Sequence, residues 1–146
     1  MKVPLLVFGT LVVIILVLIK IDYLSPKSPT AEINGHVFSL YLAKTPQEQE
    51  TGLAKFNEIN KNQGMLFLFQ KPDYYSFWMK GMKFPIDIIF INKDRIVDIF
   101  QNVPVAKDNN LPTYKTREKA DKVLEINFGL SDEYKIRIGN IVKLNL

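Results

Sequence analysis

The stretch from Gly64 to Asn92 decides the fold. It reads Gly-Met-Leu-Phe-Leu-Phe, then, after a polar break, Tyr-Tyr-Ser-Phe-Trp-Met-Lys, and then, after a short loop, Pro-Ile-Asp-Ile-Ile-Phe-Ile-Asn. Short apolar runs that are separated by turn signals are typical of strands in a packed β domain. We therefore expect these residues to form the central strands of one mostly β domain.

Residues 74–80 alternate between apolar and more polar side chains. Successive side chains of a strand point to opposite faces, so a strand here would have two different sides. One side would carry Tyr75, Phe77 and Met79, and the other would carry Tyr74, Ser76, Trp78 and Lys80.

Two Ile-rich runs, 86–91 and 95–100, flank the turn residues 92–94 and predict a β-hairpin. Both runs are apolar on both faces, which is typical of strands covered on both sides or rolled into a barrel. Further strands are expected at residues 37–43, after the Asn34-Gly35 turn signal, and at residues 121–128 and 140–146.

A helix start is predicted at Thr45, which can act as the N-cap, with Pro46 at the first helical position and Glu48 completing a capping box. We expect this helix to run to about Phe56, with Leu53 facing the core.

The remaining segments between elements read as turns and loops. The chain should turn at residues 70–73, form a loop over residues 103–118, and make a helical turn at residues 129–134. The predicted fold class is mainly β (α+β): a small closed or partly open β-barrel-like sheet with one capping helix, preceded by an N-terminal transmembrane helix.

An uncharged run rich in Leu, Val and Ile extends from Val3 to Ile19 and is closed by Lys20. A membrane span needs about 20 apolar residues, within a range of about 17–25. Residues 1–20 are therefore predicted to be a transmembrane signal anchor, with residues 3–19 in the lipid bilayer. A signal peptide cleaved near residues 28–31 and a buried core helix are the alternatives; the run is longer than the usual signal core of about 7–15 residues.

A Pro/Ser-rich linker is predicted at residues 21–31, and a single β-rich domain at residues 32–146. Lysines on the two sides of the apolar run nearly balance, so the positive-inside rule gives only a weak preference. A two-residue tail before such a run usually stays in the cytoplasm. We therefore expect a single-pass protein of the cell membrane with its domain on the extracytoplasmic side.

Charge and cysteine content exclude several function classes. The sequence has 19 basic and 15 acidic side chains. Three basic and one acidic side chain lie in residues 1–31, which leaves 16 basic and 14 acidic side chains in the domain. A domain so nearly balanced gives no electrostatic argument for a nucleic-acid partner. The absence of cysteine excludes disulfides, thiolate metal sites and thiol catalysis.

Several blocks of sequence, in order, resemble the domain-of-unknown-function 192 family. The resemblance covers nearly all of residues 32–146 and implies a small, mostly β, single-domain protein, often exported or membrane-tethered, with no established activity. The blocks are Thr45-Pro46-x-x-Gln49 with Gly52-Leu53, Gly64-Met65-Leu66-Phe67-x-Phe69, Phe77-Trp78-Met79-Lys80, Pro85-x-Asp87-Ile88, and Val123-Leu124-Glu125-Ile126 with Gly129.

The chain departs from the family pattern at two places. An arginine that usually follows Gly-Leu is not matched, and Lys55 is the nearest basic residue. The Asn-Thr pair that usually follows Met-Lys is here Gly81-Met82. If those groups line a site in the family, the site of this chain is altered.

Asp87 is the most informative polar residue, because it begins an apolar strand and should be at least partly buried. A buried carboxylate must be paired or hydrogen-bonded. In a structural interpretation, Asp87 holds the 81–84 loop through backbone N–H groups or a lysine. In a functional interpretation, it lines a ligand-binding pocket with Trp78 as a stacking platform and Lys80 as a donor.

The predicted function is that of a membrane-anchored module that either binds a ligand or supports the cell envelope. The ligand would be a small polar, saccharide-like or peptide molecule near Trp78. The alternative is a hydrolase-like enzyme that uses Asp87 and Lys80, with Glu125 or Asp98 as a second carboxylate. His36 is the only histidine and no Gly-x-Ser-x-Gly motif occurs, so triads and zinc sites lack parts. No catalytic residue is assigned.

Met79 and Met82, with Met65 and His36, suggest a less favoured alternative, a Cu(I)-binding protein, because thioethers suit that ion. Core packing explains Met65 and Met79 more simply. No metal site and no cofactor are therefore predicted.

Overall fold

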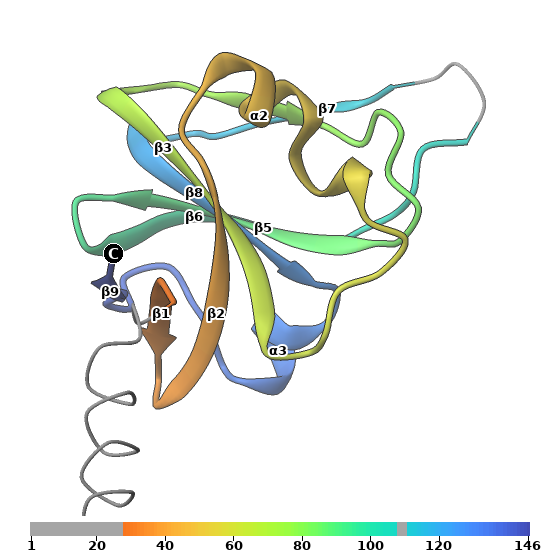
Figure 1. Cartoon of the computed structure of the whole chain (residues 1–146). Helices are drawn as coiled ribbons and strands as arrows, with labels where there is room; N and C mark the ends of the chain where they lie inside the picture. The colour runs from red at the N-terminus through yellow and green to blue at the C-terminus, as the bar shows by residue number, and fades with distance from the viewer. Residues whose placement is uncertain (1–27, 108–110) are drawn as a thin grey trace, which may run out of the picture.

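The computed structural model describes residues 28–107 and 111–146. These residues are mainly β: a seven-stranded sheet with the order β6-β5-β8-β3-β2-β1-β9 and a two-stranded sheet, β4-β7. The larger sheet curls into a half-barrel, with α2 and the β4-β7 pair at one end and α3 at the other (Figure 1). The predicted signal anchor lies outside the described residues.

The strands are β1 (Thr30–Ile33), β2 (His36–Ala43), β3 (Gln63–Asp73), β4 (Ser76–Trp78), β5 (Ile86–Asn92), β6 (Arg95–Val103), β7 (Thr113–Lys115), β8 (Ala120–Asn127) and β9 (Lys143–Asn145). The helical segments are α2 (Pro46–Thr51), the 3₁₀ turn η1 (Gly52–Lys55) and α3 (Leu130–Glu133).

The Asn34-Gly35 turn joins β1 and β2 as predicted. Both residues have positive φ, 50° and 82°, which is the backbone of the hairpin turn that Asn-Gly favours. The predicted hairpin of β5 and β6 is also confirmed, and its strands pair antiparallel from Ile86 with Val103 to Asn92 with Arg95.

The capping box that begins α2 is confirmed. The Glu48 backbone N–H donates to Thr45 Oγ1 at 3.2 Å, and the Thr45 N–H donates to Glu48 Oε2 at 2.9 Å. The predicted end near Phe56 is wrong, because the α-helix ends at Thr51 and continues only as η1. Gly52 has φ 52° and ψ −142°, a conformation outside the α-helical region that glycine adopts at little cost.

Two predicted boundaries were also wrong. The chain does not turn at residues 70–73, because β3 continues to Asp73 with a register shift against β8 after Leu68. Residues 103–118 are not all loop, since residues 113–115 form β7 against β4. A strand of three residues is too short to show a strand pattern in the sequence. It forms because the folded chain brings β4 beside it.

The core has two parts, one on each face of the large sheet. Leu66, Ile89 and Leu124 are buried in the first cluster, together with Phe38 and Leu130. The second cluster includes Met65, Phe67, Ile88, Phe90 and Val123. The central strands therefore bury both faces, as their uninterrupted apolar pattern predicted.

The two edges of the sheet come close to each other beside β9. The Ile96 N–H donates to Asn140 O at 3.0 Å, and the Val142 N–H donates to Asp94 O at 2.7 Å. These bonds join edge strand β6 to the segment that leads into β9. The mainly β class is therefore confirmed, as a curled half-barrel.

Within residues 28–107 and 111–146, every helix is too short or too polar to span a bilayer.

Candidate ligand-binding pocket

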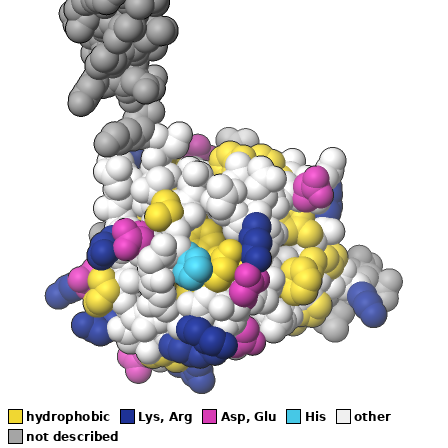
Figure 2. Space-filling model, turned by 90° about the horizontal axis from the view of Figure 1, so that it is seen from below, with side chains coloured by type: hydrophobic (Ala, Val, Ile, Leu, Met, Phe, Trp, Pro, Cys, Tyr) yellow, Lys and Arg dark blue, Asp and Glu magenta, His cyan; other side chains and the backbone are white. Residues whose placement is uncertain are grey.

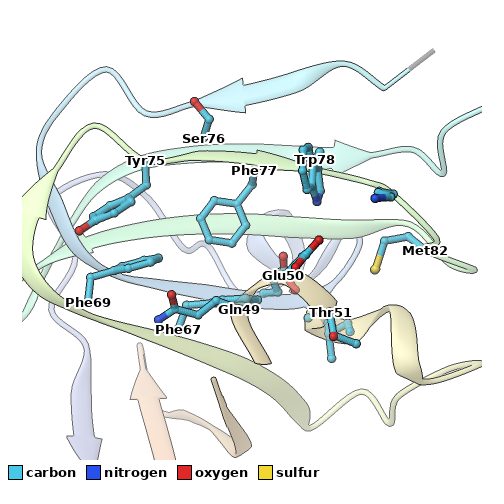
Figure 3. Close-up of a pocket in the computed structure, with 14 residues that line it drawn as sticks. Gln49, Glu50, Thr51, Phe67, Phe69, Tyr75, Ser76, Phe77, Trp78 and Met82 are labelled. Carbon is cyan, nitrogen blue, oxygen red and sulfur yellow. The ribbon is translucent and has the colours of Figure 1, made fainter. Parts of the chain in front are cut away.

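A pocket of about 220 Å³ lies at the end of the half-barrel that carries α2 and β4. Its walls come from the α2-η1 segment on one side and the β4 region on the other, and β3 and β8 contribute to its base (Figure 3). The lining residues are Gln49, Glu50, Thr51, Gly52, Leu53, Phe67, Phe69, Tyr75, Ser76, Phe77, Trp78, Lys80, Met82 and Glu125.

Aromatic rings form much of the pocket wall. The Phe69 and Tyr75 rings stack with centroids 3.7 Å apart, and Phe67 meets Phe77 edge to face at 4.9 Å. Trp78 stands at the opening with 45% of its surface exposed. Figure 3 shows Tyr75, Phe77 and Trp78 side by side along one wall, above Phe67 and Phe69.

Two of the three residues predicted to line a site, Trp78 and Lys80, are brought together here. The Lys80 Nζ lies 5.5 Å from the centre of the Trp78 ring, within the range of a cation–π contact. Strand β4 covers only Ser76–Trp78, less than the strand expected over residues 74–80, yet the alternation holds: Tyr75 and Phe77 are partly buried, while Tyr74 and Trp78 are exposed. Residues from both predicted faces, Tyr75 and Phe77 on one and Trp78 and Lys80 on the other, line the pocket.

The α2 helix supplies the polar side of the opening. The Gln49 Nε2 donates to the carbonyl of Leu68 at 2.8 Å, which fastens α2 to β3. Glu50, the next residue, is exposed and lines the pocket on the side of α2 that faces β4 (Figure 3). Gln49 belongs to one of the sequence blocks of the family resemblance, but nothing in the sequence predicted that Gln49 or Glu50 would line a pocket, because solvent-exposed helices are normally rich in such residues.

Glu125 lies at the base of the pocket. It belongs to β8, between Met65 of β3 and Ile88 of β5, and only 4% of its surface is exposed. Its Oε2 atom is buried and has no hydrogen-bond partner among the described residues. Burial raises the pKa of Glu125 to about 8, so the carboxyl is mostly protonated at neutral pH.

Two glycines let backbone approach Glu125 closely. A Cβ at Gly64 would lie 2.7 Å from the carbonyl oxygen of Glu125, so no larger residue fits there without a shift. A Cβ at Gly52 would lie 3.3 Å from the Phe67 ring and 3.8 Å from Glu125 Oε2. The end of α2 therefore sits directly over the unpaired carboxyl.

Asp87, the third residue predicted for the site, is fully buried but does not line the pocket. Its Oδ1 accepts hydrogen bonds from the backbone N–H of Asn102 at 2.7 Å and of Gly129 at 3.1 Å, and its Oδ2 accepts one from Ser131 at 2.8 Å. The expected burial is confirmed. The carboxylate holds the end of β6 and the start of α3, rather than the 81–84 loop.

Asp98 is likewise fully buried and outside the pocket lining. Burial alone would raise its pKa, but hydrogen bonds from the Arg117 side chain and from the N–H groups of Arg117 and Ile99 outweigh burial and lower the pKa below its usual value. The possible second carboxylates therefore separate: Glu125 lines the pocket with Trp78, and Asp98 does not.

The methionines lie in apolar surroundings. Met79 and Met82 are 1% and 8% exposed and pack in the second core cluster with Met65. His36 instead stacks on the Tyr134 ring at 3.7 Å. Among the described residues, no group of three His, Cys, Asp or Glu side chains could hold a metal ion. These positions agree with core packing.

The chain is a mainly β protein whose large sheet curls into a half-barrel. The family model for DUF192, described as "Uncharacterized ACR, COG1430", matches residues 29–144. The chain is a member of this family, as the sequence blocks indicated. Met82 lines the pocket.

Two solved structures are similar to the chain. A protein of unknown function from Novosphingobium aromaticivorans has 35% sequence identity and a TM-score of 0.70, over 79% of this chain and 82% of that one. A Sinorhizobium meliloti protein described as a candidate transcription regulator has 25% identity and a TM-score of 0.71, over 82% of this chain and 98% of that one. No curated protein matches the chain.

Proposed function

We propose that the chain is a membrane-tethered, extracytoplasmic module that binds a small polar ligand in the pocket between α2 and β4. One observation carries the ligand-binding part of this proposal: the exposed ring of Trp78 lines the same cavity as the buried carboxyl of Glu125, whose Oε2 has no partner among the described residues. A concave site with an aromatic wall and a few convergent polar groups is the usual form of a small-molecule site.

The size and chemistry of the pocket restrict the ligand. Its volume of about 220 Å³ is below the range of about 300–1,000 Å³ that is common for drug-sized ligands. The pocket therefore suits a single sugar ring, a single peptide side chain or a small metabolite. Trp78 offers a flat apolar face, and Lys80 and Glu50 offer a donor and an acceptor at the opening.

In this proposal the three residues predicted for the site have different roles. Trp78 and Lys80 contact the ligand at the opening. Asp87 acts indirectly, because its hydrogen bonds hold the backbone around residues 102 and 129–131 in place. Glu125 takes the buried polar position that Asp87 was expected to fill.

The membrane tether is supported by the uncharged run at residues 3–19. Its test is fractionation of cells that express the full chain, followed by protease treatment of intact and opened cells. We expect the chain in the membrane fraction, and we expect protease added to the outer side of the cell membrane to digest the domain. A chain in the soluble fraction, or a domain that protease digests only after the membrane is opened, would contradict the tether.

Binding can be measured without a label, because the chain has one tryptophan and that tryptophan lines the pocket. Monosaccharides, amino-acid amides and small amines would be titrated against the fluorescence of the full chain in a polyoxyethylene detergent, which carries neither sugar nor amine. We expect a saturable change with at least one class.

The matched control variants are Tyr75→Ala, inside the pocket, and Tyr74→Ala, which is exposed and outside its lining. We expect the first to weaken binding and the second to leave it unchanged. Equal effects of the two variants would show that the ligand binds elsewhere.

A hydrolase-like enzyme is the second candidate. It is favoured by Glu125, a proton donor near neutral pH, in the same pocket as the exposed Glu50. A protonated acid and a second carboxylate are the pair that glycosidases use. Turnover of a chromogenic glycoside that is abolished in Glu125→Gln would support it, and saturable binding without turnover would contradict it.

We propose no nucleic-acid partner, despite the description of the Sinorhizobium neighbour. On the face shown in Figure 2, basic and acidic side chains are interspersed among apolar ones. The basic and acidic side chains of the domain are also nearly equal in number, so its net charge gives no electrostatic argument for a nucleic-acid partner.

A further inference from the structure

Glu125 is buried, and one of its carboxyl oxygens is unsatisfied within the described part of the chain. Its Oε2 has no partner among the described residues, although it lies beside a cavity that is open to solvent. A buried polar group without a hydrogen bond destabilises the folded protein. Glu125 therefore lowers the stability of the folded chain unless a ligand donates a hydrogen bond to its Oε2.

The surroundings of Glu125 favour a cation. Five aromatic side chains line the cavity, namely Phe67, Phe69, Tyr75, Phe77 and Trp78, and the faces of aromatic rings attract positive charge. Two carboxyl groups, Glu125 and Glu50, line the cavity as well, and once Glu125 is ionised they outnumber the one ammonium group there, that of Lys80. The contact of Lys80 with the Trp78 ring shows that this wall already accommodates an ammonium group.

We propose that the pocket receives a primary ammonium group on a short apolar stem, with the ammonium group against the Glu125 carboxylate at the base. The inference rests on the proposed binding function and names the chemical class of its ligand. The stem would pass between the apolar side chains of Leu53, Phe77 and Met82. Either a small alkylamine or a lysine side chain of a peptide supplies this chemistry.

Binding of such a cation requires the release of a proton. In the chain without ligand, the carboxyl of Glu125 is mostly protonated at neutral pH. A positive charge nearby favours its ionised form. The proton therefore passes from Glu125 to solvent as the ammonium group enters. The other titratable groups that line the pocket are Glu50 on α2, Lys80 after β4, and Tyr75, whose pKa is raised by burial so that it stays neutral.

The alternative is a ligand that accepts a hydrogen bond from the protonated acid. The two ligand classes give opposite pH dependence. Affinity for an ammonium ligand rises as Glu125 ionises, whereas affinity for an acceptor ligand falls over the same range.

The experiment uses the full chain in polyoxyethylene detergent and the fluorescence of Trp78. The probes are n-butylammonium and N-α-acetyl-lysine amide, with N-α-acetyl-norleucine amide as the matched probe that lacks the ammonium group. Lysine amines keep their charge below about pH 9.5, so the pH dependence reports the protein. We expect affinity for both amines to rise about tenfold from pH 6 to pH 7 and to level off above pH 8.

Calorimetry in two buffers with different ionisation enthalpies gives the proton count. We expect close to one proton to be released for each ammonium ligand bound at pH 7. If the lysine amide binds more tightly than butylammonium, the source is a peptide; the reverse order indicates a free amine.

Variants separate the carboxyl from its surroundings. Glu125→Gln should weaken amine binding about tenfold or more at pH 8 and abolish its pH dependence. Glu58→Gln is the matched control, because Glu58 is exposed and outside the pocket, and it should bind like the native chain. If Glu125→Gln does not fold, the pH dependence and proton release of the native chain still decide the question.

Three results would overturn the inference. Norleucine amide binding as tightly as lysine amide, or affinity that falls as pH rises, would exclude the ammonium ligand and leave the binding function intact. If none of the probes, sugars or amino-acid amides changes the fluorescence at any pH, both the inference and the proposed function fail.

Discussion

Asp87 and Glu125 lie on adjacent paired strands of one sheet, yet their carboxyl groups have opposite surroundings. Asp87 pairs in register with Ile126, and Glu125 pairs with Ile88, one residue away along each strand. Because side chains alternate between the faces of a strand, that single step sends the two carboxyls to opposite faces of the sheet. Asp87 accepts three backbone hydrogen bonds, whereas Glu125 Oε2 accepts none among the described residues.

Burial of a carboxyl group therefore does not by itself indicate a functional site in this protein. Asp87 and Asp98 are both fully buried, and each is satisfied by donors that hold the fold together. Glu125 differs in two respects at once, since its Oε2 lacks a partner within residues 28–107 and 111–146 and it borders a cavity. The combination marks it as the candidate for ligand contact.

The largest expected effect is that of Asp87→Ala. The substitution leaves the N–H groups of Asn102, Gly129 and Ser131 without their acceptor, and we expect a loss of roughly 3–5 kcal/mol in the free energy of unfolding. Urea unfolding measures it, with Asp94→Ala at an exposed turn position as the control. A loss no greater than that of the control would show that these bonds do not support the fold.

Glu125→Gln should change how the free energy of unfolding depends on pH. The pKa of Glu125 is raised from 4.5 to about 8 because burial disfavours its ionised form, so the folded chain is most stable at low pH and loses stability as pH rises toward the native pKa. Between pH 6 and pH 8 the native chain should lose about 2 kcal/mol that the variant keeps. Urea unfolding at several pH values measures the difference, and parallel curves would contradict the raised pKa.

Gly52→Ala sharpens the comparison at the cover of the pocket. The positive φ of Gly52 and the 3.3 Å approach of a Cβ to the Phe67 ring oppose any side chain there. We expect a loss of about 1–2 kcal/mol and weaker ligand binding, because the added methyl group lies over Glu125 Oε2. Thermal unfolding and Trp78 fluorescence report the two effects. Ala54→Gly, in the same 3₁₀ turn, is the control for backbone flexibility, and it should leave binding unchanged.

Trp78→Ala should have the smallest effect on stability. The ring is 45% exposed, so its removal should cost about 1 kcal/mol or less in the free energy of unfolding. Its removal should nevertheless weaken ligand binding, measured by calorimetry because the fluorophore is gone. A large loss of stability with unchanged binding would make Trp78 a core residue instead of a ligand contact.

Local patterns in the sequence determined the strands that carry the pocket. The alternation at residues 74–80 separated the exposed Tyr74, Trp78 and Lys80 from the more buried Tyr75 and Phe77, and the capping box at Thr45 placed the start of α2. The burial of Asp87 also followed from its apolar strand. Each of these features depends on neighbours within a few residues, so hydrophobic periodicity and capping preferences are sufficient to reveal them.

Only the tertiary structure decided which carboxyl meets the cavity. Glu125 lies about forty positions along the chain from Trp78 and Asp87, and its place at the base of the pocket depends on the pairing of β8 between β3 and β5. Strand order and register are set by the sum of many long-range contacts, which no short stretch encodes. Local sequence patterns thus determined the apolar strands and the position of Trp78. The pairing of distant strands placed the carboxyl of Glu125 at the base of the pocket.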